Sequence, residues 1–316
     1  MNNMIKLIGT CALMLGSTAA TAQMAAVATP PQGTVWNTMG SAIANVARSE
    51  AGVSVLVQPY GGNRAMLDAV DQQLAEFAIN DVNDVIIAVA GEEAYSDRRR
   101  ENLRVVMTLN PMPIGIFVRS DSGINTIEDL RGKRVASDWN AFPLGRSHME
   151  AMLATGGLTW DDVQRVPVPD LIRGADALAA GRLDATFFAV GGPKVAEVDA
   201  SVGGVKFIPV NTDDEAVAAM QRVRSAFYLT DVSPAAHIAG ITETIPMVTW
   251  DNVIVAGSHV SDDVVYQMVS AILDNVPQLA SAYPGFAALS AERAGQLYEG
   301  LEHHNGAIRY FQEHGQ

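Results

Sequence analysis

Short apolar runs rich in Val, Ile and Phe alternate along the chain with helical patterns, which is typical of an α/β fold. The apolar runs predict strands at residues 26–29, 53–58, 77–80, 104–109, 114–119, 134–136, 185–189 and 253–256. Helical patterns lie between them, and Thr126 and Ser261 are candidate helix starts. The apolar residues that follow Ser261 share one helix face, which predicts core packing for Val264, Val265, Met268, Val269, Ile272 and Leu273.

The two halves of the chain carry a similar pattern, in which a helix precedes the strands near residues 74–79 and 181–188. Two similar sub-sheets are therefore expected. The strand at 114–119 would carry the chain out of the first unit, and the segment 247–255 would bring it back. This predicts lobe 1 at residues 23–114 plus 247–316, lobe 2 at 115–246, and a hinged cleft between them.

The first 22 residues have the pattern of a secretory signal peptide. Lys6 precedes a mostly apolar run at 7–20, and Ala20-Thr21-Ala22 is a small-x-small cleavage pattern. The run is too short and too weakly apolar to span a bilayer. We therefore expect removal of residues 1–22 and export of the remaining chain as a soluble protein.

Composition excludes several classes of function. The chain has 35 Asp and Glu against 21 Lys and Arg, a balance that argues against a nucleic-acid partner. Its one cysteine, Cys11, lies in the predicted signal, which leaves no disulfide or thiolate metal site. The sequence has no His-Glu-x-x-His, no Gly-x-Ser-x-Gly and no phosphate-binding loop with Gly-Lys-Ser/Thr. We expect no catalysis, no metal and no cofactor.

Seven short motifs occur in an order that resembles one known family. They are Gly33-Thr34-Val35-Trp36-Asn37, Tyr60-Gly61-Gly62, Ala78-Ile79-Asn80-Asp81, Phe117-Val118-Arg119-Ser120, Asp129-Leu130-Arg131-Gly132-Lys133, Asp184-Ala185-Thr186-Phe187-Phe188 and His304-Asn305-Gly306-Ala307. Together they resemble the TAXI-type solute-binding proteins of tripartite ATP-independent periplasmic (TRAP) transporters.

The resemblance implies a type II periplasmic-binding-protein fold and a monomeric periplasmic protein without catalysis. It also implies a small organic acid as the ligand and a TRAP membrane permease as the partner. A ligand sensor that signals to a membrane receptor, or an ABC-type binding protein with the same fold, remains open, because a docking surface has no motif.

Three loops that precede helical runs predict the cleft. They are residues 33–37, 60–64 and 137–146, and Gly61, Gly62 and Gly145 allow close backbone approach. In an open α/β sheet, ligands lie beyond the carboxyl ends of strands, where the following helices present free N–H groups.

Arg64 and Arg146 lie at or near predicted helix starts. The helix dipole disfavours a cation there by roughly 0.3 to 1 kcal/mol, and a bound carboxylate would reverse that cost. Either arginine can instead point into water or pair with a surface acid. The same alternatives hold for Asn80, which can bind a ligand or tie down its own turn.

Aromatic residues beside these loops suggest a ligand with a less polar body than an amino acid. The related family has a Gly-Ser-Gly-Thr-Arg turn where this chain has Phe142-Pro143-Leu144-Gly145-Arg146, so two hydroxyl donors are missing. Trp139 and Phe142 can form apolar walls there or serve in ordinary packing. Trp36, Asn37 and Tyr60 are further candidates for ligand contact.

Overall fold

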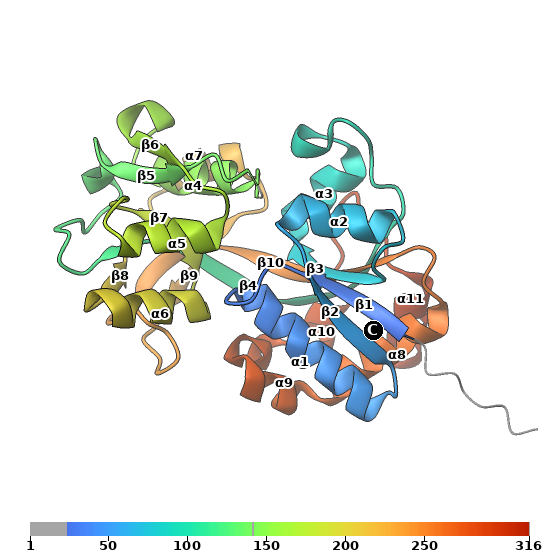
Figure 1. Cartoon of the computed structure of the whole chain (residues 1–316). Coiled ribbons are helices and arrows are strands. Elements are labelled where there is room, and N and C mark those ends of the chain that lie inside the picture. The colour runs from blue at the N-terminus through green and yellow to red at the C-terminus, as the bar shows by residue number, and fades with distance from the viewer. Residues whose placement is uncertain (1–23, 141, 316) are drawn as a thin grey trace, which may run out of the picture.

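The computed structural model describes residues 24–140 and 142–315. Its elements form two lobes, and two long strands run from one lobe to the other (Figure 1). The two-lobed α/β architecture with two crossovers that the sequence predicts is therefore present. The lobe boundaries at 114/115 and 246/247 stay a prediction, and the predicted signal peptide lies outside the described residues.

Lobe 1 contains three parallel strands between two layers of helices (Figure 1). The strands are β1 (Met24–Thr29), β2 (Ser54–Pro59) and β3 (Phe77–Asp81). Helices α2 (Asn63–Asp71) and α3 (Val82–Ala90) cover one face. The other face is covered by α1 (Val35–Glu50), α8 (Asp262–Asp274) and α9 (Val276–Ala282), with α10 (Ala291–Ala294) and α11 (Asn305–Glu313) nearby.

Lobe 2 is built from shorter strands. β5 (Arg134–Ser137) pairs in parallel with β6 (Gln164–Pro167), while β7 (Thr186–Ala189), β8 (Val205–Phe207) and β9 (Tyr228–Val232) pair with the crossover strands. Its helices are α4 (Gly145–Thr155), α5 (Leu171–Ala179), α6 (Pro193–Val202) and α7 (Asp214–Val223). Short 3₁₀ turns at Glu93–Tyr95, Glu128–Leu130, Trp160–Asp162 and Pro284–Ala288 complete the two lobes.

The crossovers are the long strands β4 (Leu103–Arg119) and β10 (Ile245–Gly257), which pair antiparallel in the centre of the sheet. Both are buried along most of their length, as expected of strands covered on two faces. Pro111 and Pro113 in β4 lie opposite Asp251 and Thr249 and have no N–H to donate. The register also shifts between Asp251 and Val253. The ladder is thus weakened where the chain passes between the lobes.

Two local predictions need correction. The strands predicted at 104–109 and 114–119 form the single strand β4, because the prolines between them occupy a weakened section of the ladder and do not end it. The helix predicted to start at Thr126 is only the 3₁₀ turn Glu128–Leu130, since Gly132 follows within one turn with φ +73°. By contrast, Ser261 caps α8 as predicted, with its hydroxyl accepting from the N–H of Val264.

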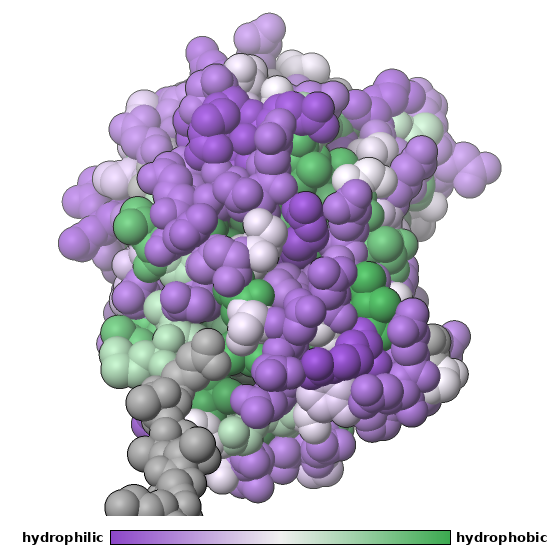
Figure 2. Space-filling view, turned by 90° about the vertical axis from the view of Figure 1, so that its right-hand side faces the viewer, coloured by the Kyte–Doolittle hydropathy of each residue, from purple (hydrophilic) through white to green (hydrophobic). Residues whose placement is uncertain are grey.

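Hydrophilic residues cover most of the face that carries α8 and α11, with apolar residues in scattered small groups (Figure 2). In residues 24–140 and 142–315, no helix is both long and apolar enough to cross a membrane. The apolar residues instead form a core that continues through both lobes and the crossovers.

Substitution of Gly306 tests how the C-terminal helix packs. A Cβ at this position would lie 2.2 Å from the carbonyl oxygen of Asp262, so α11 must move away from α8 to accept it. We expect Gly306→Ala to lower the free energy of unfolding by about 1 to 3 kcal/mol and the melting temperature by several degrees. Gln312→Ala, on an exposed position of the same helix, is the control. Equal melting temperatures for the two variants would contradict this packing.

Candidate functional site

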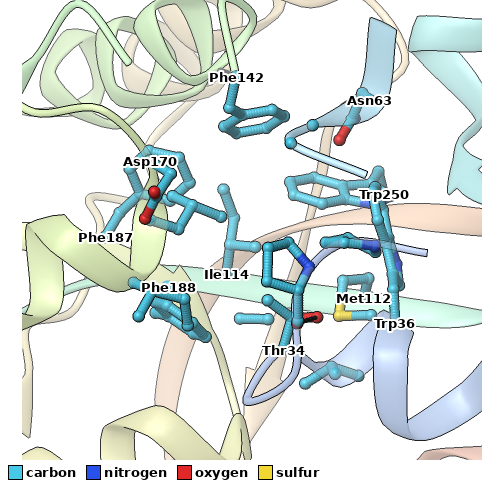
Figure 3. A pocket seen from close by; sticks show the side chains of 18 residues that line it. Thr34, Trp36, Asn63, Met112, Ile114, Phe142, Asp170, Phe187, Phe188 and Trp250 are labelled. Carbon is cyan, nitrogen blue, oxygen red and sulfur yellow. Dashed lines mark hydrogen bonds between the residues drawn. The ribbon is translucent and has the colours of Figure 1, made fainter. Parts of the chain in front are cut away.

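A cavity lies between the lobes beside the crossover strands, with about 670 Å³ of space that includes its opening to solvent (Figure 3). Residues from both lobes and both crossovers line it. Lobe 1 contributes Pro30, Pro31, Thr34, Val35, Trp36, Gly61, Gly62 and Asn63. The crossovers contribute Met112, Ile114 and Trp250, and lobe 2 contributes Phe142, Asp170, Leu171, Ile172, Phe187, Phe188 and Ala189.

The lobe 1 wall consists of loops that end strands and begin helices. After β1, Thr34 caps α1 by accepting from the N–H of Asn37 at 3.2 Å, which places Trp36 in the first helical turn. After β2, the Gly61-Gly62 pair leads into α2, and no side chain of the described residues caps this helix. The N–H groups of its first turn therefore lie beside the cavity without a side-chain acceptor.

The cavity walls are mainly apolar, and five of the lining side chains are aromatic. Figure 3 shows Trp36 and Trp250 on one side, with Phe142, Phe187 and Phe188 across from them. Each of these five side chains is buried. Flat rings on opposite sides favour a ligand with a flat apolar body, which both sides would contact.

Asp170 is the one charged side chain among the described residues that line the cavity. Its carboxylate caps α5 by accepting from the N–H of Arg173 at 2.8 Å. Figure 3 places it across the cavity from Asn63, which begins α2. The cavity therefore has a negative side at Asp170 and a hydrogen-bond-donating side at the start of α2.

A buried hydrogen bond joins the cavity wall to both crossovers. The indole N–H of Trp36 donates to Asn252 Oδ1 at 2.7 Å, and Asn252 Nδ2 lies 3.5 Å from Asn110 Oδ1. Trp36 thus connects α1 of lobe 1 to β10 and β4. Within the described chain, the indole N–H of Trp250 is buried without a partner.

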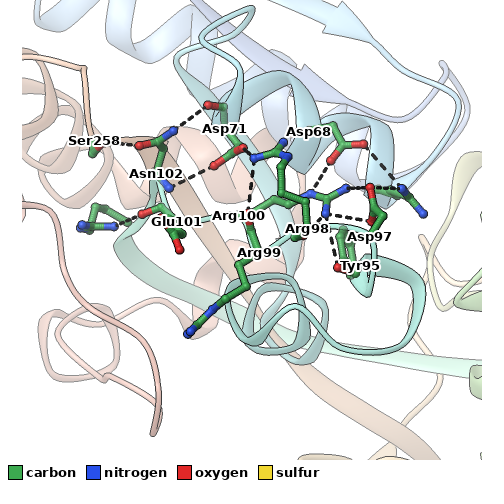
Figure 4. A network of polar contacts seen from close by, with 12 residues as sticks. Asp68, Asp71, Tyr95, Asp97, Arg98, Arg99, Arg100, Glu101, Asn102 and Ser258 are labelled. Carbon is green, nitrogen blue, oxygen red and sulfur yellow. Dashed lines mark hydrogen bonds and ion pairs between the residues drawn. The ribbon is translucent and has the colours of Figure 1, made fainter.

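Arg64 does not line this cavity. Its guanidinium lies 2.9 Å from Asp97 and 3.6 Å from Asp68, and it also donates to the carbonyl of Ala94. The same two acids bind Arg100, Asp68 at 2.7 Å and Asp97 at 3.1 Å, within the polar network of Figure 4. Arg64 is therefore occupied by carboxylates of its own lobe, which is the alternative that the sequence left open.

Arg146 does not line the cavity either. It is exposed, and its guanidinium lies 6.0 Å from the ring of Trp160. Trp139 is fully buried behind the wall, with its ring 5.2 Å from that of Phe187. A Cβ on Gly145 would lie 2.8 Å from Phe142 and 3.0 Å from Trp139, so this glycine lets the two rings pack together. The loop contributes Phe142 to the apolar wall, and the guanidinium of Arg146 lies outside the cavity in this conformation.

The remaining candidates lie one layer behind the wall or at the surface. Asn80 is fully buried, accepts from the N–H of Asp81 at 2.9 Å, and has its amide 3.5 Å from the carbonyl of Asn63. Asn37 donates to Thr29 Oγ1 at 3.0 Å and to the carbonyl of Pro30 at 3.3 Å. Both support lining residues. The hydroxyl of Tyr60 donates to Gln58, and its side chain is outside the lining.

Of the predicted site residues, the structure brings together Trp36, Gly61, Gly62 and Phe142. Sequence reasoning missed Asp170, Asn63 and the Phe187-Phe188 pair as lining residues. The phenylalanines carried no separate signal, because a strand covered on both faces places consecutive apolar residues in the core. Asp170 carried a weak signal as an acid before a helical run, which fits many caps.

Polar contacts also join the lobes around the cavity. Arg224 at the end of α7 binds Glu93 of lobe 1 through two hydrogen bonds of 2.8 and 2.9 Å. The N–H of Lys194 donates to the carbonyl of Gly33 at 3.2 Å. His148 Nε2 lies 3.2 Å from Asp81 Oδ2. The structure thus shows the lobes in contact on several sides of the cavity.

A model described as the NMT1-like family matches residues 27–315. The chain belongs to the NMT1-like family.

Solved structures share the fold at low identity. One, described as a periplasmic transporter, has a TM-score of 0.58 and 14% identity, covering 93% of both chains. The alkanesulfonate-binding protein SsuA from Xanthomonas axonopodis pv. citri, bound to MOPS, has a TM-score of 0.52 and 14% identity, covering 94% of this chain and 92% of that chain. The substrate-binding protein of an amino acid ABC transporter has a TM-score of 0.50 and 12% identity, with coverage of 83% and 98%. The type II periplasmic-binding-protein fold is thereby confirmed.

The pH dependence of stability should report on Asp84, which lies beside the cavity. This fully buried carboxyl accepts from Asn63, and burial first, then Asp81, raises its pKa well above the ordinary value. A raised folded-state pKa gives a stabilising contribution that is full below the unfolded pKa and lost as pH rises through the folded pKa. In Asp84→Asn, stability relative to wild type should therefore rise with pH.

Urea unfolding between pH 4 and 8 measures this difference, with Asp214→Asn, at an exposed acid, as the control. A constant difference between Asp84→Asn and wild type across this range would show that the carboxyl carries no such shift.

Proposed function

We propose that the protein is a periplasmic solute-binding protein that captures a small organic molecule with a flat, mainly apolar body between its lobes. The observation that carries this proposal is the apolar cavity, with aromatic rings from both lobes and from a crossover, that both lobes and both crossovers build. A ligand there would contact Trp36 in lobe 1 and Phe142 in lobe 2 at once. Such a ligand favours closure, because contacts to both lobes exist only in the closed form.

The ligand's polar group would lie at the start of α2. Gly62 and Asn63 present backbone N–H groups there, so an acceptor such as a carboxylate or an amide carbonyl fits. Asp170 on the opposite side disfavours a second negative charge. A small organic acid with one carboxylate, the class expected from the sequence, remains compatible, whereas a dicarboxylate does not.

Delivery to a membrane transporter completes the proposed role. Three similar structures are described as a periplasmic transporter, an alkanesulfonate-binding protein and the binding protein of an amino acid ABC transporter. The resemblance to TAXI-type proteins favours a TRAP permease as the partner of a monomeric receptor without catalytic activity. An ABC-type transporter is the second candidate, because one of these similar structures is described as the substrate-binding protein of an amino acid ABC transporter.

A thermal-shift screen of matched pairs tests the ligand class. Benzoate and benzamide, indole-3-acetate and its amide, and succinate as a dicarboxylate cover the alternatives. A compound at 100 times its dissociation constant should add about 2.7 kcal/mol to stability. We expect shifts with flat aromatic compounds and none with succinate. A shift with succinate alone would contradict the proposed ligand class.

Removal of one aromatic wall should weaken binding of the best compound of this screen. Phe142→Ala deletes a buried ring that faces the cavity, and we expect a loss of about 1 to 3 kcal/mol, roughly 5-fold to 150-fold in Kd. Arg146→Ala, four residues along, is the control and should leave Kd unchanged. If calorimetry shows the reverse pattern, the ligand binds at the arginine.

Closure should depend on the ion pair between Arg224 and Glu93. Arg224 is buried and its fork binds both carboxylate oxygens across the lobe boundary, so Glu93→Ala leaves a buried cation without its interlobe partner. We expect the radius of gyration from X-ray scattering to rise and ligand affinity to fall by about 1 to 3 kcal/mol. Glu92→Ala is the control, since no ion pair of that side chain occurs in the described chain. An unchanged radius and affinity in Glu93→Ala would mean that this pair does not hold the lobes.

A further inference from the structure

Asn63 presents a buried side-chain oxygen to the cavity. It is the first residue of α2, is 2% exposed, and lines the cavity. Its side-chain amide donates to Asp84 Oδ2, behind the cavity wall. Figure 3 shows the side-chain oxygen of Asn63 pointing toward the space between Phe142 and Trp250. In the described chain no donor reaches this oxygen, so it is able to accept a hydrogen bond from a ligand.

Asp84 holds the Asn63 amide in this orientation. Asp84 is fully buried on α3, and Asn63 Nδ2 is the one donor that reaches its carboxyl within the described residues. The neutral and the charged carboxyl can both accept this bond, because both have an accepting oxygen. Turning the amide over would take the donor away and leave a buried carboxyl without a hydrogen bond, which is costly. The oxygen of Asn63 therefore stays on the cavity side.

The other free polar side-chain atoms at the cavity are acceptors too. Asp170 uses one carboxylate oxygen to cap α5, and its second oxygen has no donor in the described chain. The hydroxyl of Thr34 donates to the carbonyl of Pro31 at 2.9 Å, and the two indole N–H groups of the wall are hydrogen-bonded or fully buried. No Arg, Lys or His lines the cavity among the described residues. Donors for a ligand therefore come from the backbone N–H groups at the start of α2.

A donor and an acceptor thus belong to the same residue at the start of α2. The backbone N–H of Asn63 donates, and its side-chain Oδ1 accepts. A primary carboxamide has the complementary pair, a carbonyl oxygen and an N–H₂ group on one carbon. A carboxylate has acceptors alone, so it leaves Asn63 Oδ1 without a donor. Its charge would also face Asp170 with no side-chain cation to balance it.

We infer that the site selects a neutral carboxamide on a flat apolar body over the corresponding carboxylate, with Asn63 Oδ1 accepting from the amide N–H₂ of the ligand. The inference rests on the proposed function and narrows its ligand class. Asn63 is then the residue that distinguishes the amide from the acid, while the aromatic rings of the wall bind the flat body that the two compounds share.

Calorimetry on the wild-type protein at pH 7 tests this selection without any substitution. The ligands are benzamide, benzoate and N,N-dimethylbenzamide, together with indole-3-acetamide, indole-3-acetate and the N,N-dimethyl amide of that acid. We expect each primary amide to bind about tenfold more tightly than its acid and its dimethyl amide. The reason is that the acid and the dimethyl amide both leave the buried Asn63 oxygen without a donor.

The possible results separate the inference from the proposed function. An acid that binds at least as tightly as its primary amide would mean that the N–H₂ group of Asn63 faces the cavity, and it would overturn the inference. A dimethyl amide that binds as tightly as the primary amide would overturn it as well. In both cases the proposed function stands, because flat compounds bind. Absence of binding by all six compounds would overturn the proposed function and the inference with it.

Asn63→Ala removes the oxygen and keeps the backbone N–H groups. We expect the primary amides to lose about tenfold in affinity and the dimethyl amides to lose little, so that the two kinds of amide bind nearly equally. Asn305→Ala is the control, because Asn305 is the exposed first residue of α11, and it should preserve the tenfold difference. A tenfold difference that persists in Asn63→Ala would show that another group accepts the amide N–H₂ and would overturn the role of Asn63. If this variant does not fold, the wild-type comparison decides.

Discussion

The antiparallel pairing of β4 with β10 joins the two lobes and forms the floor of the sheet beside the cavity. These two strands are the ones that run through both lobes, and their residues Met112, Ile114 and Trp250 form part of the cavity wall. Prolines and a register shift weaken the ladder where it leaves lobe 1. The sheet thus fixes the cavity between the lobes and places its most deformable section beside that cavity.

The cavity has an apolar interior, and polar contacts between the lobes surround it. Aromatic rings supply the contacts available to a ligand, while Arg224, Glu93, His148 and Asp81 join the lobes around them. Glu93 has a φ of +47°, which is costly for a residue with a side chain, and its bidentate contact with Arg224 offsets part of that cost. The proposed ligand and these polar contacts would stabilise the same closed form.

The sequence was sufficient to predict the fold because the relevant signals are local. Apolar runs indicated the strands, Ser261 indicated the start of α8, and the segment 247–255 indicated the return crossover. The fusion of two predicted strands into β4 was not predictable in this way, because prolines normally end strands. Here the pairing with β10 continues past the two prolines.

The site was predictable in part. Loops that precede helices predicted four of the lining residues, Trp36, Gly61, Gly62 and Phe142. The pairing of Arg64 with Asp97 was not predictable, because Asp97 lies in a turn distant in the sequence. The pairing of His148 with Asp81 spans 67 residues and two lobes, so no local pattern shows it.

A crystal structure grown with the compound that gives the largest thermal shift would show where the ligand binds. We expect the compound between Trp36 and Phe142, in contact with both lobes, with its acceptor at Gly62 and Asn63. A compound bound at Arg64 or Arg146, or on one lobe alone, would contradict this expectation.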